Sequence, residues 1–181
     1  SSQALTDNII KDLAITVFTK NYQYVVPINK LMNAGTEFYI NFSIVDDCGT
    51  VQHSNDILSP LGHTFYRAIV PTFDNGYLLG GDVFAPSSYI KPYLLKVDSL
   101  GNQQWEQAYT QVPKLGRVWD ILPAADSSGY FVLTAYNYDE ITFTLQPRIT
   151  KISNNGDSIL LDKVYNFETD YYYGIRLKYG I

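Results

Sequence analysis

Short apolar runs separated by polar turns fill the chain from residue 13 onward. Runs such as Phe65–Val70, Tyr77–Val83 and Tyr130–Tyr136 are bounded by turns rich in Asp, Asn, Gly and Ser. Apolar runs of this length between turn residues are typical of β-strands. Tyr, with 16 copies in 181 residues, adds to this signal because it favours half-buried pleated surfaces. The pattern therefore predicts an all-β protein.

The predicted strands fall into successive sets of four, and one more strand begins a further set at 171–178. Within each set, a tight turn joins the third strand to the fourth. The predicted ranges are 13–18, 22–26, 37–45 and 50–54; 65–70, 77–83, 93–97 and 102–109; and 117–122, 130–136, 148–152 and 158–165.

The glycines of the turns give the period of this repetition. Gly49, Gly101 and Gly156 are 52 and 55 positions apart, and Gly76 and Gly129 are 53 apart. Turns such as Asp-Asn-Gly and Asn-Asn-Gly supply the positive φ that tight hairpins need. Two independent markers with one period indicate an internal repeat of one four-stranded unit.

A repeat of this length with four strands predicts a β-propeller of four-stranded antiparallel blades. Each sheet has two faces that need a neighbour, and stacking sheets around an axis covers both. A β-sandwich also has short strands and regular turns, but it does not require the same turn chemistry at one spacing. The predicted units are an N-terminal arm at 1–12, blades at 13–58, 64–110 and 116–166, and the first strand of a fourth blade at 171–181.

Three blades and one strand do not close a ring, since closed propellers have roughly 4–8 blades. We therefore expect an incomplete propeller, which is either the N-terminal part of a longer protein or one of several chains that complete a ring. The first of these is favoured because the chain stops after one strand of a unit.

The repeat resembles a known class. Residues 74–81 and 93–105, which end in Lys-Val-Asp-Ser-Leu-Gly-Asn-Gln-Gln-Trp, resemble the propeller repeats of secreted and outer-surface proteins of Bacteroidota. Residues 126–135 and 148–160 match more loosely, and 13–54 departs most because it lacks the Gly-Tyr turn. The resemblance implies an extracytoplasmic protein, often at the cell surface and usually without known catalysis.

The resemblance also implies structural roles for the turn residues. In this class they shape a turn or pack between blades, and the Trp docks at a blade interface. The residues concerned are Asp74, Gly76, Asp98, Gly101, Trp105, Asp126, Gly129 and Gly156.

Charge and cysteine content exclude several partner classes. The formal net charge is −5 at pH 7, whereas nucleic-acid binding needs a basic stripe. No apolar run approaches the roughly 20 residues of a transmembrane helix. Cys48 is the sole cysteine, so an internal disulfide or a multi-cysteine zinc site is excluded.

The two histidines, His53 and His63, follow or adjoin acidic residues such as Asp46, Asp47 and Asp56. Such a set can bind a metal ion, but two solvated surface histidines are the favoured interpretation. No catalytic residue, metal site or cofactor is predicted.

Aromatic residues are the candidate ligand contacts. Loops that join second to third strands, and those that join units, are expected on one rim, where exposed aromatics suit glycan stacking or protein contacts. Trp119 lies on a predicted first strand, which would line the central channel. The rim candidates are Phe84, Tyr89, Tyr109, Tyr138, Phe167 and Tyr171.

The sequence thus favours a non-catalytic, surface-exposed or secreted binding or scaffold module. Its partner would be a protein of the cell surface or outer membrane, or an extracellular glycan or peptide. One alternative is a fragment of a propeller hydrolase or lyase whose catalytic residues lie in further blades. Another is an accessory lipoprotein subunit of an outer-membrane nutrient importer, with its anchor cysteine just before Ser1.

Overall fold

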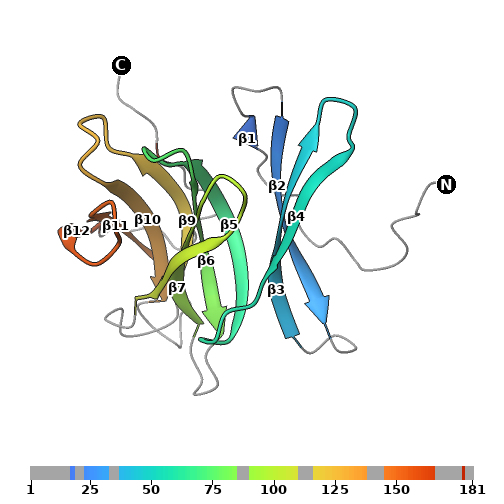
Figure 1. Cartoon of the computed structure of the whole chain (residues 1–181). Coiled ribbons are helices and arrows are strands. Elements are labelled where there is room, and N and C mark those ends of the chain that lie inside the picture. The colour runs from blue at the N-terminus through green and yellow to red at the C-terminus, as the bar shows by residue number, and fades with distance from the viewer. Residues whose placement is uncertain are drawn as a thin grey trace.

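The computed structural model consists of three four-stranded antiparallel sheets, and the residues that it describes include no helix (Figure 1). The predicted all-β class with antiparallel sheets is therefore confirmed. The described residues are 17–18, 23–32, 37–84, 90–109, 116–137, 145–165 and 177.

Each strand predicted between residues 13 and 165 overlaps an observed one, whereas the predicted N-terminal arm at 1–12 and the predicted strand at 171–178 lie outside the described residues, residue 177 apart. In each sheet the strands pair in chain order without a crossover. The strands are β1 (Val17–Phe18), β2 (Gln23–Met32), β3 (Glu37–Asp46) and β4 (Val51–Ile57) in the first sheet; β5 (His63–Pro71), β6 (Tyr77–Phe84), β7 (Ile90–Val97) and β8 (Gln103–Ala108) in the second; and β9 (Gly116–Pro123), β10 (Tyr130–Asn137), β11 (Leu145–Ile152) and β12 (Ile159–Val164) in the third.

The predicted end of the second strand near Pro27 is wrong, because β2 continues to Met32. Pro27 pairs with Phe42 of β3, but its carbonyl accepts a hydrogen bond from the Tyr66 hydroxyl in the next sheet. The backbone polar groups of Pro27 therefore point away from β3. Its missing N–H removes no bond to β3, so the strand tolerates the proline.

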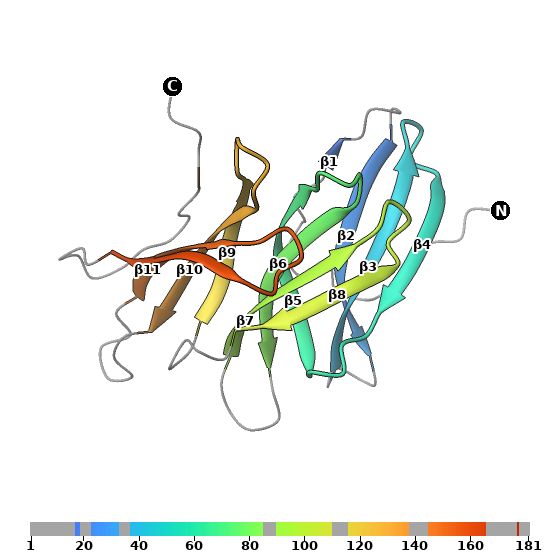
Figure 2. The same cartoon turned by 60° about the vertical axis from the view of Figure 1, so that its left-hand side comes forward.

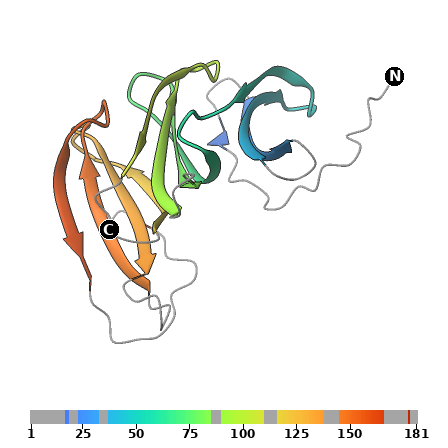
Figure 3. The ribbon, with the colours of Figure 1, turned by 90° about the horizontal axis from the view of Figure 1, so that it is seen from below.

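The three sheets lie side by side in chain order. Figure 2 shows the second sheet between the other two, and Figure 3 shows the same succession from below. Alternate residues of β6 face opposite neighbours: Leu79 packs in a core with the first sheet and Leu78 in a core with the third. This double burial explains why β6 and β7 read as continuous apolar runs rather than alternating ones.

The tyrosines of the repeated Gly-Tyr turns make equivalent contacts between neighbouring sheets. Tyr77, the first residue of β6, packs on Phe42 of the first sheet with ring centroids 5.5 Å apart. Tyr130, the first residue of β10, stacks on Phe73 of the second sheet at 5.4 Å. The repeated tyrosine therefore anchors each sheet to the one before it.

The glycines of the turns between third and fourth strands pack in the same manner. A Cβ atom at Gly101 would lie 2.2 Å from the Phe42 ring of the first sheet. A Cβ atom at Gly156 would lie 2.6 Å from the Trp105 ring of the second sheet. Both glycines have positive φ, of 81° and 74°. Each turn therefore needs glycine for its backbone conformation and for its close approach to an aromatic ring.

Candidate functional site

Two arginines, an aspartate and a tryptophan meet where the second and third sheets pack together. Arg67 comes from β5, Asp82 from β6, and Arg117 and Trp119 from β9. β5 and β9 are the first strands of their sheets and lie against each other. We call these four residues the arginine cluster.

The carboxylate of Asp82 joins the two arginines. The Nε atom of Arg67 donates a hydrogen bond to Oδ1 of Asp82 over 2.7 Å, and the Nε atom of Arg117 lies 3.8 Å from Oδ2. The Asp82 side chain is fully buried, whereas the side chains of Arg67 and Arg117 are 23% and 39% exposed. The cluster thus has a buried acidic centre and two partly exposed cations.

Aromatic rings hold the Arg67 guanidinium in place. Its central carbon lies 5.5 Å from the centroid of the Trp119 ring and 6.0 Å from that of Phe65. Both distances are within the range of cation–π attraction. The side chain is therefore fixed by an ion pair and by two rings.

A β-bulge directs Arg67 toward Asp82. The pairing of β5 with β6 shifts between Tyr66 and Ala68, so that Arg67 has no residue opposite it in the ladder. Gly81 lies opposite Tyr66, and a Cβ atom there would be 1.7 Å from the carbonyl oxygen of Phe65. The glycine thus permits the close approach of the two backbones that the bulge requires, and bulges of this kind re-aim a side chain.

Burial and charge oppose each other at Asp82. Burial raises the pKa of its carboxyl group, and the neighbouring Arg67 and Arg117 only partly offset that rise. Oδ2 of Asp82 has no hydrogen-bond partner among the described residues. Two guanidinium groups face one carboxylate, so the cluster carries an excess positive charge although the chain as a whole carries −5.

The structure places some of the predicted ligand contacts. Trp119 belongs to the arginine cluster and is half-buried. Phe84 ends β6 and is 38% exposed. Tyr109 packs against the core between the second and third sheets, and its hydroxyl donates to the carbonyl of Gly156. Burial raises the pKa of Tyr109. The other rim candidates, Tyr89, Tyr138, Phe167 and Tyr171, lie outside the described residues.

The aspartates of the turns accept hydrogen bonds from their own turns. Oδ1 of Asp98 accepts from the backbone N–H groups of Leu100 and Asn102, at 2.8 and 2.9 Å. Oδ1 of Asp126 accepts from the backbone N–H and hydroxyl groups of Ser128, at 3.1 and 2.5 Å. These carboxylates shape their turns by bonding to the chain two to four residues ahead.

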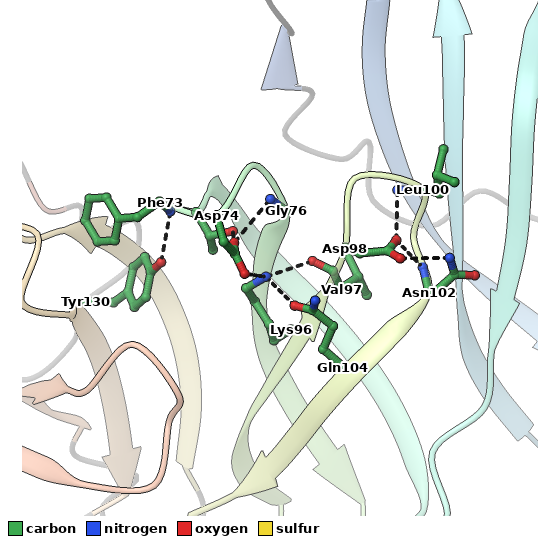
Figure 4. A network of polar contacts seen from close by, with 11 residues as sticks. Phe73, Asp74, Gly76, Lys96, Val97, Asp98, Leu100, Asn102, Gln104 and Tyr130 are labelled. Carbon is green, nitrogen blue, oxygen red and sulfur yellow. Dashed lines mark hydrogen bonds and ion pairs between the residues drawn. The ribbon is translucent and has the colours of Figure 1, made fainter.

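A buried lysine links two turns of the second sheet (Figure 4). The Nζ atom of Lys96 donates to Asp74 at 2.9 Å, to the carbonyl of Val97 at 3.1 Å and to Gln104 at 2.6 Å, while its side chain is only 3% exposed. Gly76 lies beside this ammonium group. A Cβ atom at Gly76 would be only 2.6 Å from Nζ, so the glycine leaves room for the lysine.

The third sheet contains an equivalent pair of a lysine and a turn aspartate. Lys151 approaches Asp126 at 3.5 Å, and Lys96 and Lys151 occupy the same place before their turns. Gly129 lies in the same turn as Asp126, and a Cβ atom there would be 1.9 Å from the carbonyl oxygen of Ile152. The lysine of the repeat is therefore a structural partner of its aspartate.

We expect Asp74→Asn to make the free energy of unfolding depend less on pH in the acid range. Burial acts to raise the pKa of Asp74, but hydrogen bonds from Thr72, Lys96 and Gly76 outweigh it and lower the pKa to about 2. A carboxyl group with a lowered folded-state pKa stabilises the fold above its unfolded value of 3.8, and this contribution is lost as pH falls through about 2. The variant should lose about 1 kcal/mol near neutral pH, because the Asp74 carboxylate is largely exposed.

Urea denaturation between pH 7 and pH 2 measures this effect, and the gap between Asp74→Asn and the parent chain should close below about pH 4. Asp47→Asn, at an exposed position, is the matched control and should change stability by less than about 0.5 kcal/mol. A gap that persists at pH 2 would contradict the assignment.

A group of possible metal ligands lies in the turn after β3. Side-chain atoms of Asp46, Asp47 and Cys48 lie within 4.8 Å of one another. Asp46, however, accepts bonds from the backbone N–H groups of Cys48 and Thr50, and from the side chain of Gln52. These bonds account for its lowered pKa, of which the bond from Thr50 is the main cause. The group is thus explained as a turn.

Sequence reasoning found Trp119 but missed the three charged residues around it. One signal was available, because Asp82 stands inside an otherwise apolar run and directly follows Gly80 and Gly81. A glycine within a strand often marks a bulge or a close approach of another backbone.

No protein-family model matches the chain, and no curated protein matches it in sequence. In the part of the chain that the structure describes, no helix has the length and apolar character needed to cross a membrane.

Proposed function

We propose that the three sheets are consecutive blades of a β-propeller, and that the chain acts as a non-catalytic binding module. Three features support the proposal of a propeller: the sheets follow in chain order, the first strands of neighbouring sheets meet, and the middle sheet is covered on both faces. In a propeller, first strands surround the central channel, and ligands of ring-shaped folds are met there or on the adjoining rim.

The arginine cluster is the observation that carries the binding role. It lies on the first strands of its sheets, and its Arg67 is held by Asp82, Phe65 and Trp119 before any ligand arrives. Such pre-organisation lowers the entropy cost of binding. Arginine stays protonated at physiological pH, so these two residues can hold a ligand's charge but do not exchange protons with it. The proposed setting is extracytoplasmic, with an extracellular glycan or peptide as ligand.

Fluorescence of Trp119 tests the proposal. The chain has two tryptophans, so Trp105→Phe leaves Trp119 as the reporter. Glycan and peptide arrays supply candidate ligands, and each hit is titrated into the Trp105→Phe chain. We expect a saturable change in emission for at least one hit. Calorimetry, which needs no tryptophan reporter, should show a loss of affinity of roughly tenfold in Trp119→Ala, because stacking on an aromatic ring contributes about 1–3 kcal/mol.

Tyr24→Ala is the matched control, since it removes an exposed aromatic ring on β2 of the first sheet, outside both the arginine cluster and the predicted rim. It should leave the affinity unchanged. The proposal fails if the arrays give no hit, or if hits bind Trp119→Ala as tightly as the parent chain while both proteins melt cooperatively.

A further inference from the structure

The position of Asp82 has a counterpart in the first sheet. Asn29 of β2 and Asp82 of β6 are each five residues beyond a tyrosine at the start of the strand, at Tyr24 and Tyr77. Both tyrosines pair with the last valine of the next strand. Asn29 and Asp82 are therefore equivalent, and each reaches toward the sheet that follows.

Asn29 joins its neighbouring sheet without any charge. Its amide nitrogen donates to the carbonyl of Tyr66 at 3.1 Å, and its amide oxygen accepts from the N–H of Tyr66 at 2.9 Å. Both partners are backbone groups of β5. A neutral amide is thus sufficient to connect one sheet to the next at this position.

At the junction of the second and third sheets, the equivalent position instead brings together a carboxylate and two guanidinium groups, of which Arg117 comes from β9 of the third sheet. Burying charges costs free energy that pairing seldom recovers in full, so a buried ion pair is weak evidence for a stabilising role. The incomplete pairing agrees with this, because Oδ2 of Asp82 lacks a hydrogen bond and lies 3.8 Å from Arg117. The charges exceed what a junction between sheets requires.

Both arginines have N–H donors that no described residue uses. In both, the Nε atom is the one that approaches Asp82. For their terminal nitrogens, the part of the chain that the structure describes supplies no hydrogen-bond acceptor. Arginine presents five N–H donors in a planar fork, and the edge formed by its terminal nitrogens matches the two oxygens of a carboxylate.

We propose that Arg67 and Arg117 bind a carboxylate group of the ligand, with Asp82 as the positioning residue that orients both guanidinium groups. This inference rests on the proposed binding function and names the chemistry of its ligand. The carboxylate would balance the second positive charge, which Asp82 leaves unmatched. Its source is either an acidic sugar or the carboxylate of a peptide.

Small probes test the carboxylate directly. The Trp105→Phe chain is titrated with D-glucuronate, D-glucose, N-acetylglycine and sulfate at constant ionic strength, and binding is followed by Trp119 fluorescence and by calorimetry. We expect D-glucuronate to bind with a dissociation constant roughly tenfold or more below that of D-glucose, since a bond to a charged group contributes at least that much. Arg117→Gln should abolish the difference.

Control variants separate the site from general charge effects. Arg148→Gln removes an arginine that pairs with Asp162 away from the cluster, and it should leave the preference for D-glucuronate intact. Arg117→Lys keeps the charge but loses the planar fork, so it should recover only part of the affinity. Thermal melting of every variant shows that the differences arise in folded protein.

If N-acetylglycine binds as tightly as D-glucuronate, the result supports the carboxylate and identifies a peptide as its source. If D-glucuronate binds and N-acetylglycine does not, the source is an acidic sugar. Equal affinity for D-glucuronate and D-glucose, or an unchanged preference in Arg117→Gln, would overturn the inference. Sulfate binding more tightly than both carboxylates would also overturn it. If array ligands without a carboxylate still bind through Trp119, the carboxylate inference fails while the proposed binding function stands.

Discussion

Gly81→Ala is expected to lower the free energy of unfolding by about 3 kcal/mol, near the upper end for overpacking. The new Cβ atom would lie 1.7 Å from the carbonyl oxygen of Phe65 and 2.6 Å from the Cα atom of Tyr66. Both are backbone atoms of β5, so no rotation of a side chain relieves the contact. Guanidinium denaturation followed by circular dichroism measures the change.

Gly49→Ala is the matched control for this variant. Gly49 has a φ of 79°, but a Cβ atom there would have no heavy atom within 4 Å. The variant should therefore lose only the left-handed backbone cost of about 1–2 kcal/mol. Equal losses in the two variants would show that the contact between β5 and β6 relaxes freely, which contradicts a glycine required by the bulge.

The bulge links this stability effect to binding. Because Gly81 allows the bulge that directs Arg67 toward Asp82, any folded Gly81→Ala protein should also bind its ligand less tightly. Gly49→Ala lies in the turn between β3 and β4, far along the chain from the arginine cluster, and should retain binding. The pair of variants therefore distinguishes loss of the site from loss of stability alone.

The strands and turns of the fold could be predicted from the sequence because local residue patterns determine them. Turn glycines with positive φ, such as Gly101 and Gly156, end one strand and begin the next, and apolar runs occupy the intervals between them. The continuation of β2 through Pro27 could not be predicted from the sequence. It depends on which edge of the strand bonds to β3, and on a carbonyl that bonds to Tyr66 in another sheet.

The candidate site could be predicted only in part, for a similar reason. Trp119 could be predicted from its place on a first strand. The relation of Arg67, Asp82 and Arg117 depends on a bulge and on the packing of β5 and β6 against β9, which join residues far apart in the sequence. The role of Lys96 was missed as well, although its repetition at Lys151 beside Asp126 gave a signal.

The arginine cluster also makes a stability prediction that follows from buried charge. Arg67→Met removes the only cation that hydrogen-bonds to Asp82 among the described residues, and leaves a fully buried carboxylate with Arg117 at 3.8 Å. Removing one partner of a buried ion pair typically costs 3–5 kcal/mol, and we expect a loss of about that size near neutral pH. Urea denaturation at several pH values measures it.

The pH dependence identifies the cause of this loss. Burial already raises the pKa of Asp82, and Arg67 is the stronger of the two cations that lower it. A carboxyl group with a raised folded-state pKa contributes its full stability below the unfolded value of 3.8, and this contribution is lost as pH rises through the folded-state pKa. The deficit of Arg67→Met relative to the parent chain should therefore shrink as the pH is lowered from about 8 toward about 4.

Replacing both charges tests whether the pair stabilises the fold. Asp82→Leu combined with Arg67→Met should recover most of the loss, because apolar replacements of buried pairs are often neutral or stabilising. Lys30→Met, which breaks the exposed pair of Lys30 and Asp56 at 3.5 Å, is the control and should cost less than about 1 kcal/mol. A double variant as unstable as Arg67→Met would mean that the pair, which joins β5 to β6 within the second sheet, itself stabilises the fold. A stable double variant without ligand binding would mean that these charges serve recognition.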